Sequence, residues 1–180
     1  MAQLNYPYLL LRTAFSFMTC DGDIDRSEVL TIKNMDKSTH LFGDIDIGKE
    51  LELMLERINL KGMDFLKEYF RKVDKAKLSE DQEMELLQVA VDIIYADDQV
   101  KDEEVKFLRV LRTLLKVTDE KILGQFPQLA KDFMWEDDFT DEYIKILYSN
   151  YFKNQTLPVF DVSDVQDISG NMDMGNKAEA

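Results

Sequence analysis

Two short acidic segments contain the residues of this chain that are best suited to chemistry. Residues 20–29 read Cys-Asp-Gly-Asp-Ile-Asp-Arg-Ser-Glu-Val, and residues 96–105 read Ala-Asp-Asp-Gln-Val-Lys-Asp-Glu-Glu-Val. In each segment an apolar helical run stops at an Asp, a β-branched residue follows, and a carboxylate opens the next helix. The 76-residue offset indicates an internal duplication that would arrange two sets of carboxylates around one pseudo-two-fold axis. Carboxylate oxygens in such an arrangement are typical ligands of hard divalent cations.

A calcium loop of the EF-hand type is excluded. Asp21, Asp23 and Asp25 fit positions one, three and five of such a loop. Position six requires Gly and is Arg26, whereas position twelve requires a bidentate Glu and is Ile32. The acidic segments must therefore be explained in another way.

Helix capping is the alternative to a binding site. Carboxylates at a helix N-terminus accept hydrogen bonds from free N–H groups and oppose the macrodipole, which typically stabilises by about 0.5 to 1 kcal/mol each. Capping explains Asp25 and Glu28 well. It explains four residues less well, because they precede the caps and add mutual repulsion: Asp21, Asp23, Asp97 and Asp98. Both interpretations remain open at this point.

The charge of the chain restricts its partners. The formal net charge is -14 at pH 7 over 180 residues, and the sequence pI is near 4.5. We expect no nucleic acid partner, because phosphates require clusters of Lys and Arg, and an anionic membrane surface is disfavoured for the same reason. Cations and basic protein surfaces remain, so we expect an unidentified protein partner, with a merely solvated acidic surface as the alternative.

Cysteine use and hydropathy indicate a cytoplasmic protein. Cys20 is the only cysteine, and the N-terminal apolar stretch contains Arg12 with no basic region before it. No apolar stretch approaches the roughly 18 residues that a membrane helix needs, so we expect a protein that is not membrane-integral. Cys20, at the end of a buried helix, is interpreted as a packing thiol, and His40 as a surface or capping residue.

Apolar residues recur at helical spacing through most of the chain. The expected helices cover residues 7–18, 25–38, 47–58, 65–73, 79–94, 105–116, 118–123 and 140–151. The one candidate strand, Leu157 to Val162, contains Pro158. The predicted fold class is all-α, a single helical domain of about seven to nine helices with a pseudo-duplicated helix-pair core.

A change in composition predicts the domain boundary. The helical domain is expected to span residues 1–153, followed by an acidic tail over residues 154–180. The tail is expected to be mobile beyond Ile168, with Val159 and Phe160 attaching its start to the body.

Known enzyme signatures are missing from the sequence. It has no Gly-rich dinucleotide or phosphate loop, no His-Glu-x-x-His and no Gly-x-Ser-x-Gly. A single His also excludes the paired Glu-x-x-His motifs of di-iron bundles. We therefore expect a non-enzymatic protein with no organic cofactor, and a metal-dependent hydrolase that uses the carboxylates remains an alternative.

Taken with their helices, the acidic segments resemble the tellurite-resistance TerB family. The pattern Asp-Gly-x-Ile-Asp-x-x-Glu lies within Phe17 to Leu30. Its second copy lies within Val91 to Leu115, as Ile-x-Tyr-Ala-Asp followed by Glu-x-x-x-Leu-x-x-Leu. The resemblance covers roughly residues 8–130, with the helices of residues 131–153 beyond it.

The resemblance implies an all-helical domain with a pseudo-duplicated core and a role in resistance to tellurite and other stresses. It also implies a carboxylate cluster for a divalent metal such as Ca²⁺, Mg²⁺ or Mn²⁺. The matching positions here are Asp21, Asp23, Asp25 and Glu28 in the first copy and Asp97 and Glu104 in the second. The chain departs from the family pattern at Asp98, Gln99 and Lys101, which replace the turn Gly, an acidic residue and an Asp.

The expected protein is thus a cytoplasmic, TerB-like, non-enzymatic module whose acidic site binds a cation or a partner during stress. The alternative is a helical scaffold whose acidic turns are caps and whose apolar groove or tail recruits another protein.

We make three predictions of geometry, two from the duplication and one from Pro127. Helix pairs 8–38 and 80–116 should be related by a rotation of about 180° and share one core. The two acidic turns should meet, which would raise at least one carboxylate pKa by mutual repulsion. After Thr118 the chain should break at Pro127 and lie across one side of the core, with Trp135 at the junction.

Overall fold

We describe a computed structural model of the chain. The structure describes residues 5–132, 140–153 and 155–166, and these contain helices and no strand. The helices are α1 (Tyr6–Thr19), α2 (Arg26–Thr39), α3 (Ile47–Lys61), α4 (Met63–Lys75), α5 (Glu80–Ile94), α6 (Asp102–Thr113), α7 (Asp119–Gln125), α8 (Leu129–Asp132) and α9 (Asp141–Phe152), with a short 3-10 helix, η1 (Val162–Asp164). The predicted all-α class is confirmed, and residues 157–162 form no strand.

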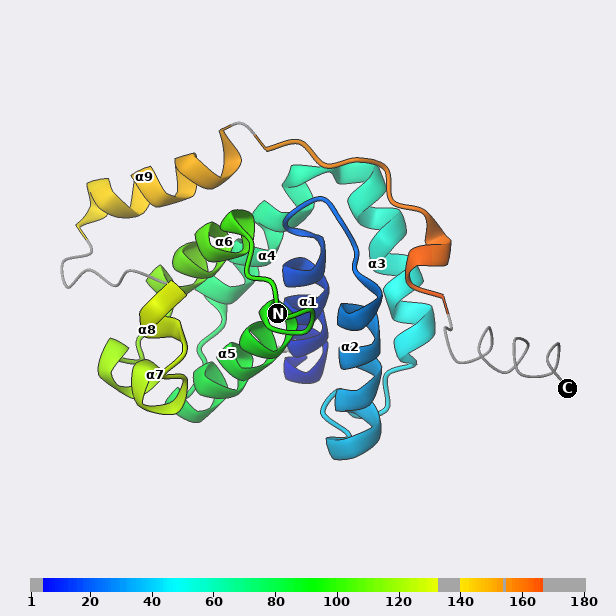
Figure 1. Ribbon diagram of the computed structural model, residues 1–180, viewed down its shortest axis with the longest axis horizontal. Coiled ribbons are helices and arrows are strands. Elements are labelled where there is room, and N and C mark those ends of the chain that lie inside the picture. The colour runs from blue at the N-terminus through cyan, green and yellow to red at the C-terminus, as the bar shows by residue number, and fades with distance from the viewer. Residues whose placement is uncertain (1–4, 133–139, 154, 167–180) are drawn as a thin grey trace, which may run out of the picture.

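Helix α1 is the centre of the domain. It begins with Asn5, whose side chain accepts a hydrogen bond from the Tyr8 backbone N–H at 3.1 Å, and Pro7 lies in its first turn. Every residue from Leu9 to Thr19 is buried, as the apolar circumference of the run predicts. In Figure 1, α2 and α3 lie on one side of α1 and α5 and α6 lie on the other.

The two predicted helix pairs share one hydrophobic core. The eight residues predicted to be buried are Leu11, Phe15, Met18, Leu87, Val91, Ile94, Leu108 and Leu111, and each is at most 2% exposed. Helices α1 and α5 pack along one another, and α2 packs on both. The prediction of a common core is therefore confirmed.

Arg12 is the charged residue that the sequence places inside the buried helix, and its contacts explain how it is tolerated. Its Nη2 atom donates to the Phe65 carbonyl at 3.3 Å and lies 3.5 Å from Glu68. The guanidinium also lies over the Phe65 ring, 4.3 Å from the centroid. These contacts join α1 to α4.

The C-terminal third covers one side of the core. Helix α7 ends at Gln125, just before Pro127, and α8 restarts the chain at Leu129, which confirms the predicted break. Helix α9 then packs on α6. The predicted position of Trp135 lies outside the described residues.

Residues 155–166 run from α9 across the top of the molecule to α3 (Figure 1). Phe160 is buried, and its backbone exchanges two hydrogen bonds with the Asn59 side chain, at 2.8 and 2.9 Å. Val165 is also buried, whereas Val159 is exposed. Phe160, but not Val159, therefore attaches this start of the predicted tail to the body.

No helix in the described part of the chain is both long enough and apolar enough to cross a membrane.

Candidate functional site

The two acidic turns follow the same backbone path. In the first turn the Asp23 N–H donates to Asp21 Oδ1 at 3.0 Å, and in the second the Gln99 N–H donates to Asp97 Oδ1 at 3.0 Å. Each turn has a left-handed residue between these partners, Gly22 in the first and Asp98 in the second. Asp is among the few residues that adopt this conformation at modest cost, so the turn survives the loss of its glycine.

The helices that follow the turns also begin alike. The Glu28 carboxylate accepts a hydrogen bond through Oε2 from the Asp25 N–H, at 3.3 Å. Glu104 Oε2 accepts the Lys101 N–H in the same way at 3.0 Å. Capping thus accounts for one oxygen of each glutamate. Asp25 is occupied as a cap as well, because its Oδ1 atom accepts the Ser27 N–H at 2.8 Å.

The second oxygen of each glutamate is not explained by capping. Glu28 and Glu104 are each only 1% exposed. Their Oε1 atoms are buried and make no hydrogen bond with any described group. An unpaired buried carboxylate oxygen is costly, so these two atoms need a proton, a cation or another donor.

The acidic turns meet, as predicted. Lys101 Nζ, from the second turn, lies 2.7 Å from Asp21 Oδ2 in the first turn and 3.9 Å from Asp23 Oδ2. The Asp21 side chain is 3% exposed, whereas that of Asp23 is 76% exposed. Lys101 and Asp21, which are 80 residues apart in the sequence, therefore join the two turns.

Burial and charge both perturb the carboxylates. The pKa of Glu28 is raised to about 9, first by burial and then by the charge of Asp21, with a contribution from Glu104. The pKa of Glu104 is raised to about 7 by burial and then by Asp21 and Asp97. The predicted upward shift is confirmed, but its leading cause is burial, whereas the sequence argument assigned it to mutual repulsion.

The pKa of the Lys101 ammonium is also raised, which for a lysine favours the charged form. Burial lowers its pKa, but the hydrogen bond and the charge of Asp21 outweigh burial, so the pKa of Lys101 rises overall. Lys101 therefore stays positively charged beside the carboxylates. In the described part of the chain, no three Asp, Glu, His or Cys side chains are arranged to hold a metal ion as they stand.

Cys20 and His40 have the structural roles that the sequence predicts. Cys20 is fully buried, its Sγ lies 3.2 Å from the Phe17 carbonyl, and burial followed by the charge of Asp21 raises the pKa of its thiol. It is a packing thiol. His40 is exposed and ends α2 as its left-handed C-cap.

The C-terminal segment holds the first acidic turn in place, which the sequence did not indicate. The Cys20 carbonyl accepts hydrogen bonds from Tyr151 Oη at 2.7 Å and from Gln155 Nε2 at 3.2 Å. A Cβ atom on Gly22 would lie 3.4 Å from Pro158 Cδ. The backbone beside Asp21 is thus fixed by residues more than 130 positions later in the chain.

We expect Tyr151→Phe to destabilise the protein by about 1 kcal/mol, because it removes a buried hydrogen bond and leaves the Cys20 carbonyl with a single donor. Urea unfolding checks this value. Tyr148→Phe, a half-buried position on the same helix, serves as the comparison. A change below about 0.3 kcal/mol in Tyr151→Phe would show that the α9 contact does not hold the turn.

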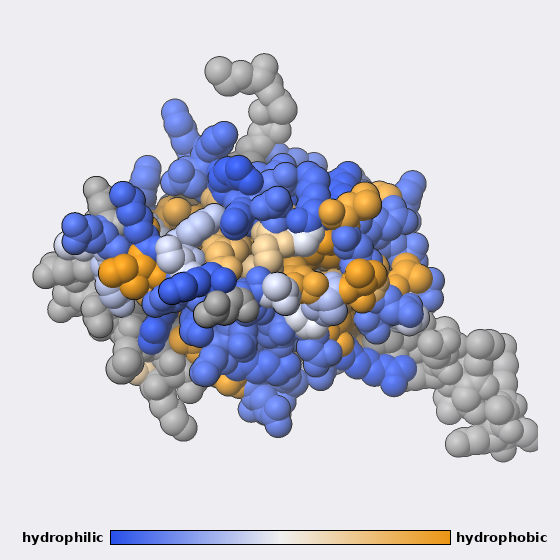
Figure 2. Space-filling view, turned by 90° about the horizontal axis from the view of Figure 1, so that it is seen from above, coloured by the Kyte–Doolittle hydropathy of each residue, from blue (hydrophilic) through white to orange (hydrophobic). Residues whose placement is uncertain are grey.

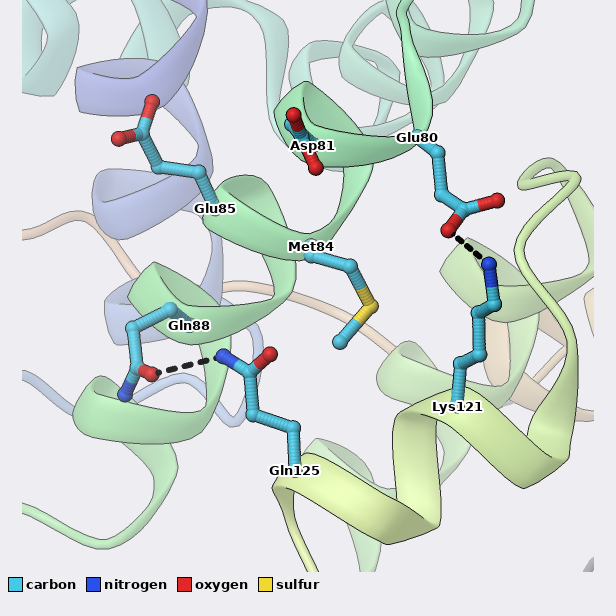
Figure 3. A pocket seen from close by; sticks show the side chains of 7 residues that line it. All are labelled: Glu80, Asp81, Met84, Glu85, Gln88, Lys121 and Gln125. Carbon is cyan, nitrogen blue, oxygen red and sulfur yellow. Dashed lines mark hydrogen bonds and ion pairs between the residues drawn. The ribbon is translucent and has the colours of Figure 1, made fainter.

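A separate pocket of about 570 Å³ lies between α5 and α7 (Figure 3). Glu80 and Lys121 form an ion pair at one end, and Gln125 Nε2 donates to Gln88 Oε1 at 3.4 Å at the other. The first half of α5 lines this pocket, whereas the acidic turn follows the end of α5. A hydrolase needs a pocket beside its carboxylates, so this one lends that alternative no support.

Fold and site together define an all-helical domain in which two copies of an acidic turn converge. A family model described as tellurite resistance protein TerB matches residues 10–124. The chain therefore belongs to the TerB family. Comparisons with curated proteins and with solved structures gave no match. Helix α9 and residues 155–166 lie beyond the part of the chain that the family model covers.

Proposed function

We propose that this protein is a cytoplasmic, non-enzymatic TerB-like module of the stress response, associated with tellurite resistance, whose acidic site binds a divalent cation. Membership of the family supports the stress role. The cation site is supported by the chemistry of the converging turns.

The observation that carries the proposal is the pair of unpaired carboxylate oxygens. Glu28 Oε1 and Glu104 Oε1 are buried and find no hydrogen-bond partner among the described residues, and the charge of Asp21 acts on both side chains. A divalent cation would displace the protons that the raised pKa values of Glu28 and Glu104 retain, and it would give both Oε1 atoms the partner that helix capping does not supply.

The donor set indicates the class of cation. Glu28, Glu104 and Asp21 offer hard oxygen atoms. The charge of Asp97 acts on Glu104, and Asp23 Oδ2 lies 3.9 Å from Lys101 Nζ. Such ligands suit Ca²⁺, Mg²⁺ or Mn²⁺ better than ions that prefer sulfur or imidazole. The Asp25 carboxylate is engaged as the cap of α2.

The proposal is tested by calorimetry and thermal melting with Ca²⁺, Mg²⁺, Mn²⁺ and Zn²⁺ in turn. We expect one of the first three ions to bind at one site per chain. A free ion concentration of 100 times Kd should then stabilise the fold by about 2.7 kcal/mol. The double variant Asp21→Asn/Asp97→Asn should lose both the binding heat and the rise in melting temperature.

The matched control is Asp44→Asn/Asp74→Asn, which makes the same change in net charge at two exposed positions. Its response to the metal should equal that of the wild type. The proposal fails if none of the four ions alters the melting temperature, or if Asp21→Asn/Asp97→Asn responds like the wild type.

The scaffold alternative is favoured by the capping hydrogen bonds of Asp25, Glu28 and Glu104. It predicts a protein that is indifferent to all four ions. Figure 2 views the face that residues 155–166 cross, and apolar groups form several separate areas there among hydrophilic residues. On this face a partner would find no single continuous apolar surface. The buried unpaired Oε1 atoms of Glu28 and Glu104 make the cation site the better supported function.

A further inference from the structure

We propose that Lys101 is a tethered competitor of the divalent cation, so that its ammonium sets the ion concentration at which the acidic site is filled. This inference rests on the proposed function, because it concerns the same site.

The position of the ammonium carries the inference. Lys101 Nζ lies 2.7 Å from Asp21 Oδ2, and the Asp21 side chain is almost completely buried. A divalent ion that used this carboxylate oxygen would meet the ammonium at close range, where two positive charges repel strongly. The ion and the ammonium therefore cannot share Asp21.

The internal duplication explains why the Lys101 side chain extends to the first acidic turn. Lys101 holds the position that Asp25 holds in the first copy, 76 residues earlier. The Asp25 carboxylate stays on its own helix and caps α2. A lysine has no acceptor atom for that role, and α6 has no side-chain cap hydrogen bond. The Lys101 side chain instead extends to the first acidic turn. At this position the second copy therefore has a cation where the first copy has a capping carboxylate.

The lysine can also leave the site. Its side chain is 30% exposed, so the ammonium can turn into solvent on its flexible stem when an ion arrives. The unpaired Oε1 atoms of Glu28 and Glu104 belong to the same buried cluster, since the charges of Asp21 and Lys101 act on both. Ion binding would thus release one cation and satisfy carboxylates that the lysine does not reach.

The test compares Mn²⁺ binding by calorimetry in the wild type, Lys101→Met and Lys106→Met. Lys101→Met keeps an apolar stem and removes the charge, and Lys106→Met removes the same charge from an exposed position on α6. We expect Kd for Mn²⁺ to fall by about 10- to 100-fold in Lys101→Met and by less than about threefold in Lys106→Met. Lys101→Asp should also bind Mn²⁺ more tightly than the wild type. Its carboxylate would cap α6 as Asp25 caps α2, so this variant tests the inference even if Lys101→Met folds poorly.

A second measurement needs no substitution. Acetylation by acetic anhydride, followed by mass spectrometry, reports the reactivity of Lys101 relative to Lys106 in the wild type. Saturating Mn²⁺ should raise that ratio several-fold, because the displaced ammonium enters solvent. An unchanged ratio in a protein that binds Mn²⁺ overturns the inference.

The outcomes separate this inference from the proposed function. Equal Kd values in the wild type and Lys101→Met overturn the competitor role and leave the cation site standing. Tight binding in Lys101→Met together with none in the wild type supports the competitor role but refutes cation binding by the native chain. No binding in any variant overturns both.

Discussion

Replacing Glu28 with Gln is expected to stabilise the protein at pH 8 by about 2 kcal/mol or more and to flatten its pH dependence. The pKa of Glu28 is about 9 in the folded protein, against an ordinary 4.5. Between these values the folded state holds a proton that the unfolded state has lost, so the free energy of unfolding of the wild type falls as the pH rises from about 4.5 to about 9. Gln cannot ionise, and it keeps an oxygen for the Asp25 N–H.

Urea unfolding at pH 5, 6, 7, 8 and 9 measures this effect. The control is Glu56→Gln, which removes one charge from an exposed position on α3 and should follow the pH dependence of the wild type. The difference between Glu28→Gln and the control should be small at pH 5 and grow with pH. If Glu28→Gln is equally or less stable than the control at pH 8, ionisation of the buried Glu28 carboxylate does not destabilise the folded protein.

Phe107→Ala is expected to cost about 3 to 5 kcal/mol of stability, because it leaves a large cavity at the junction of four helices. The Phe107 ring on α6 lies 4.8 Å from that of Phe17 on α1, 4.5 Å from that of Phe70 on α4 and 5.1 Å from that of Tyr151 on α9. Aromatic pairs at these separations add to the value of the buried area. Chemical denaturation, with the linear extrapolation to water, gives the value.

Leu60→Ala is the comparison for the Phe107 variant, since Leu60 is 87% exposed and should change stability by less than about 0.5 kcal/mol. A loss below about 1 kcal/mol in Phe107→Ala would mean that α9 does not complete the core through this ring.

The fold could be predicted from the sequence because apolar spacing and caps agree along most of the chain. Ser79 and Asp25, for example, both begin helices where their side chains indicate caps. Individual contacts between segments far apart in the sequence could not be predicted. Arg12 contacts α4 through the Phe65 carbonyl. The Glu83 carboxylate accepts hydrogen bonds from the Lys116 and Val117 N–H groups at 2.8 to 3.1 Å. Both buried charges find their partners only through tertiary packing.

The site could be predicted in part. The 76-residue repeat located both turns and their convergence, and the rotation of about 180° between the helix pairs stays a prediction. The role of Lys101 was missed, because the sequence shows only that it departs from the acidic pattern. The equivalence of Lys101 to Asp25 was the available signal. A lysine ammonium cannot cap the N-terminus of its own helix, so its side chain must find a partner elsewhere. Tyr151 and Gln155 gave no signal, since their partner is a backbone carbonyl.

The central claim is that the converged turns form one cation site held by buried carboxylates. A crystal structure of the full chain with Mn²⁺, with anomalous differences recorded at the manganese edge, tests it most directly. We predict one anomalous peak between the turns, with oxygens of Glu28 and Glu104 about 2.0 to 2.6 Å from the ion and Lys101 turned into solvent. Peaks confined to exposed carboxylates such as Asp44, with Lys101 still bound to Asp21, would contradict the claim.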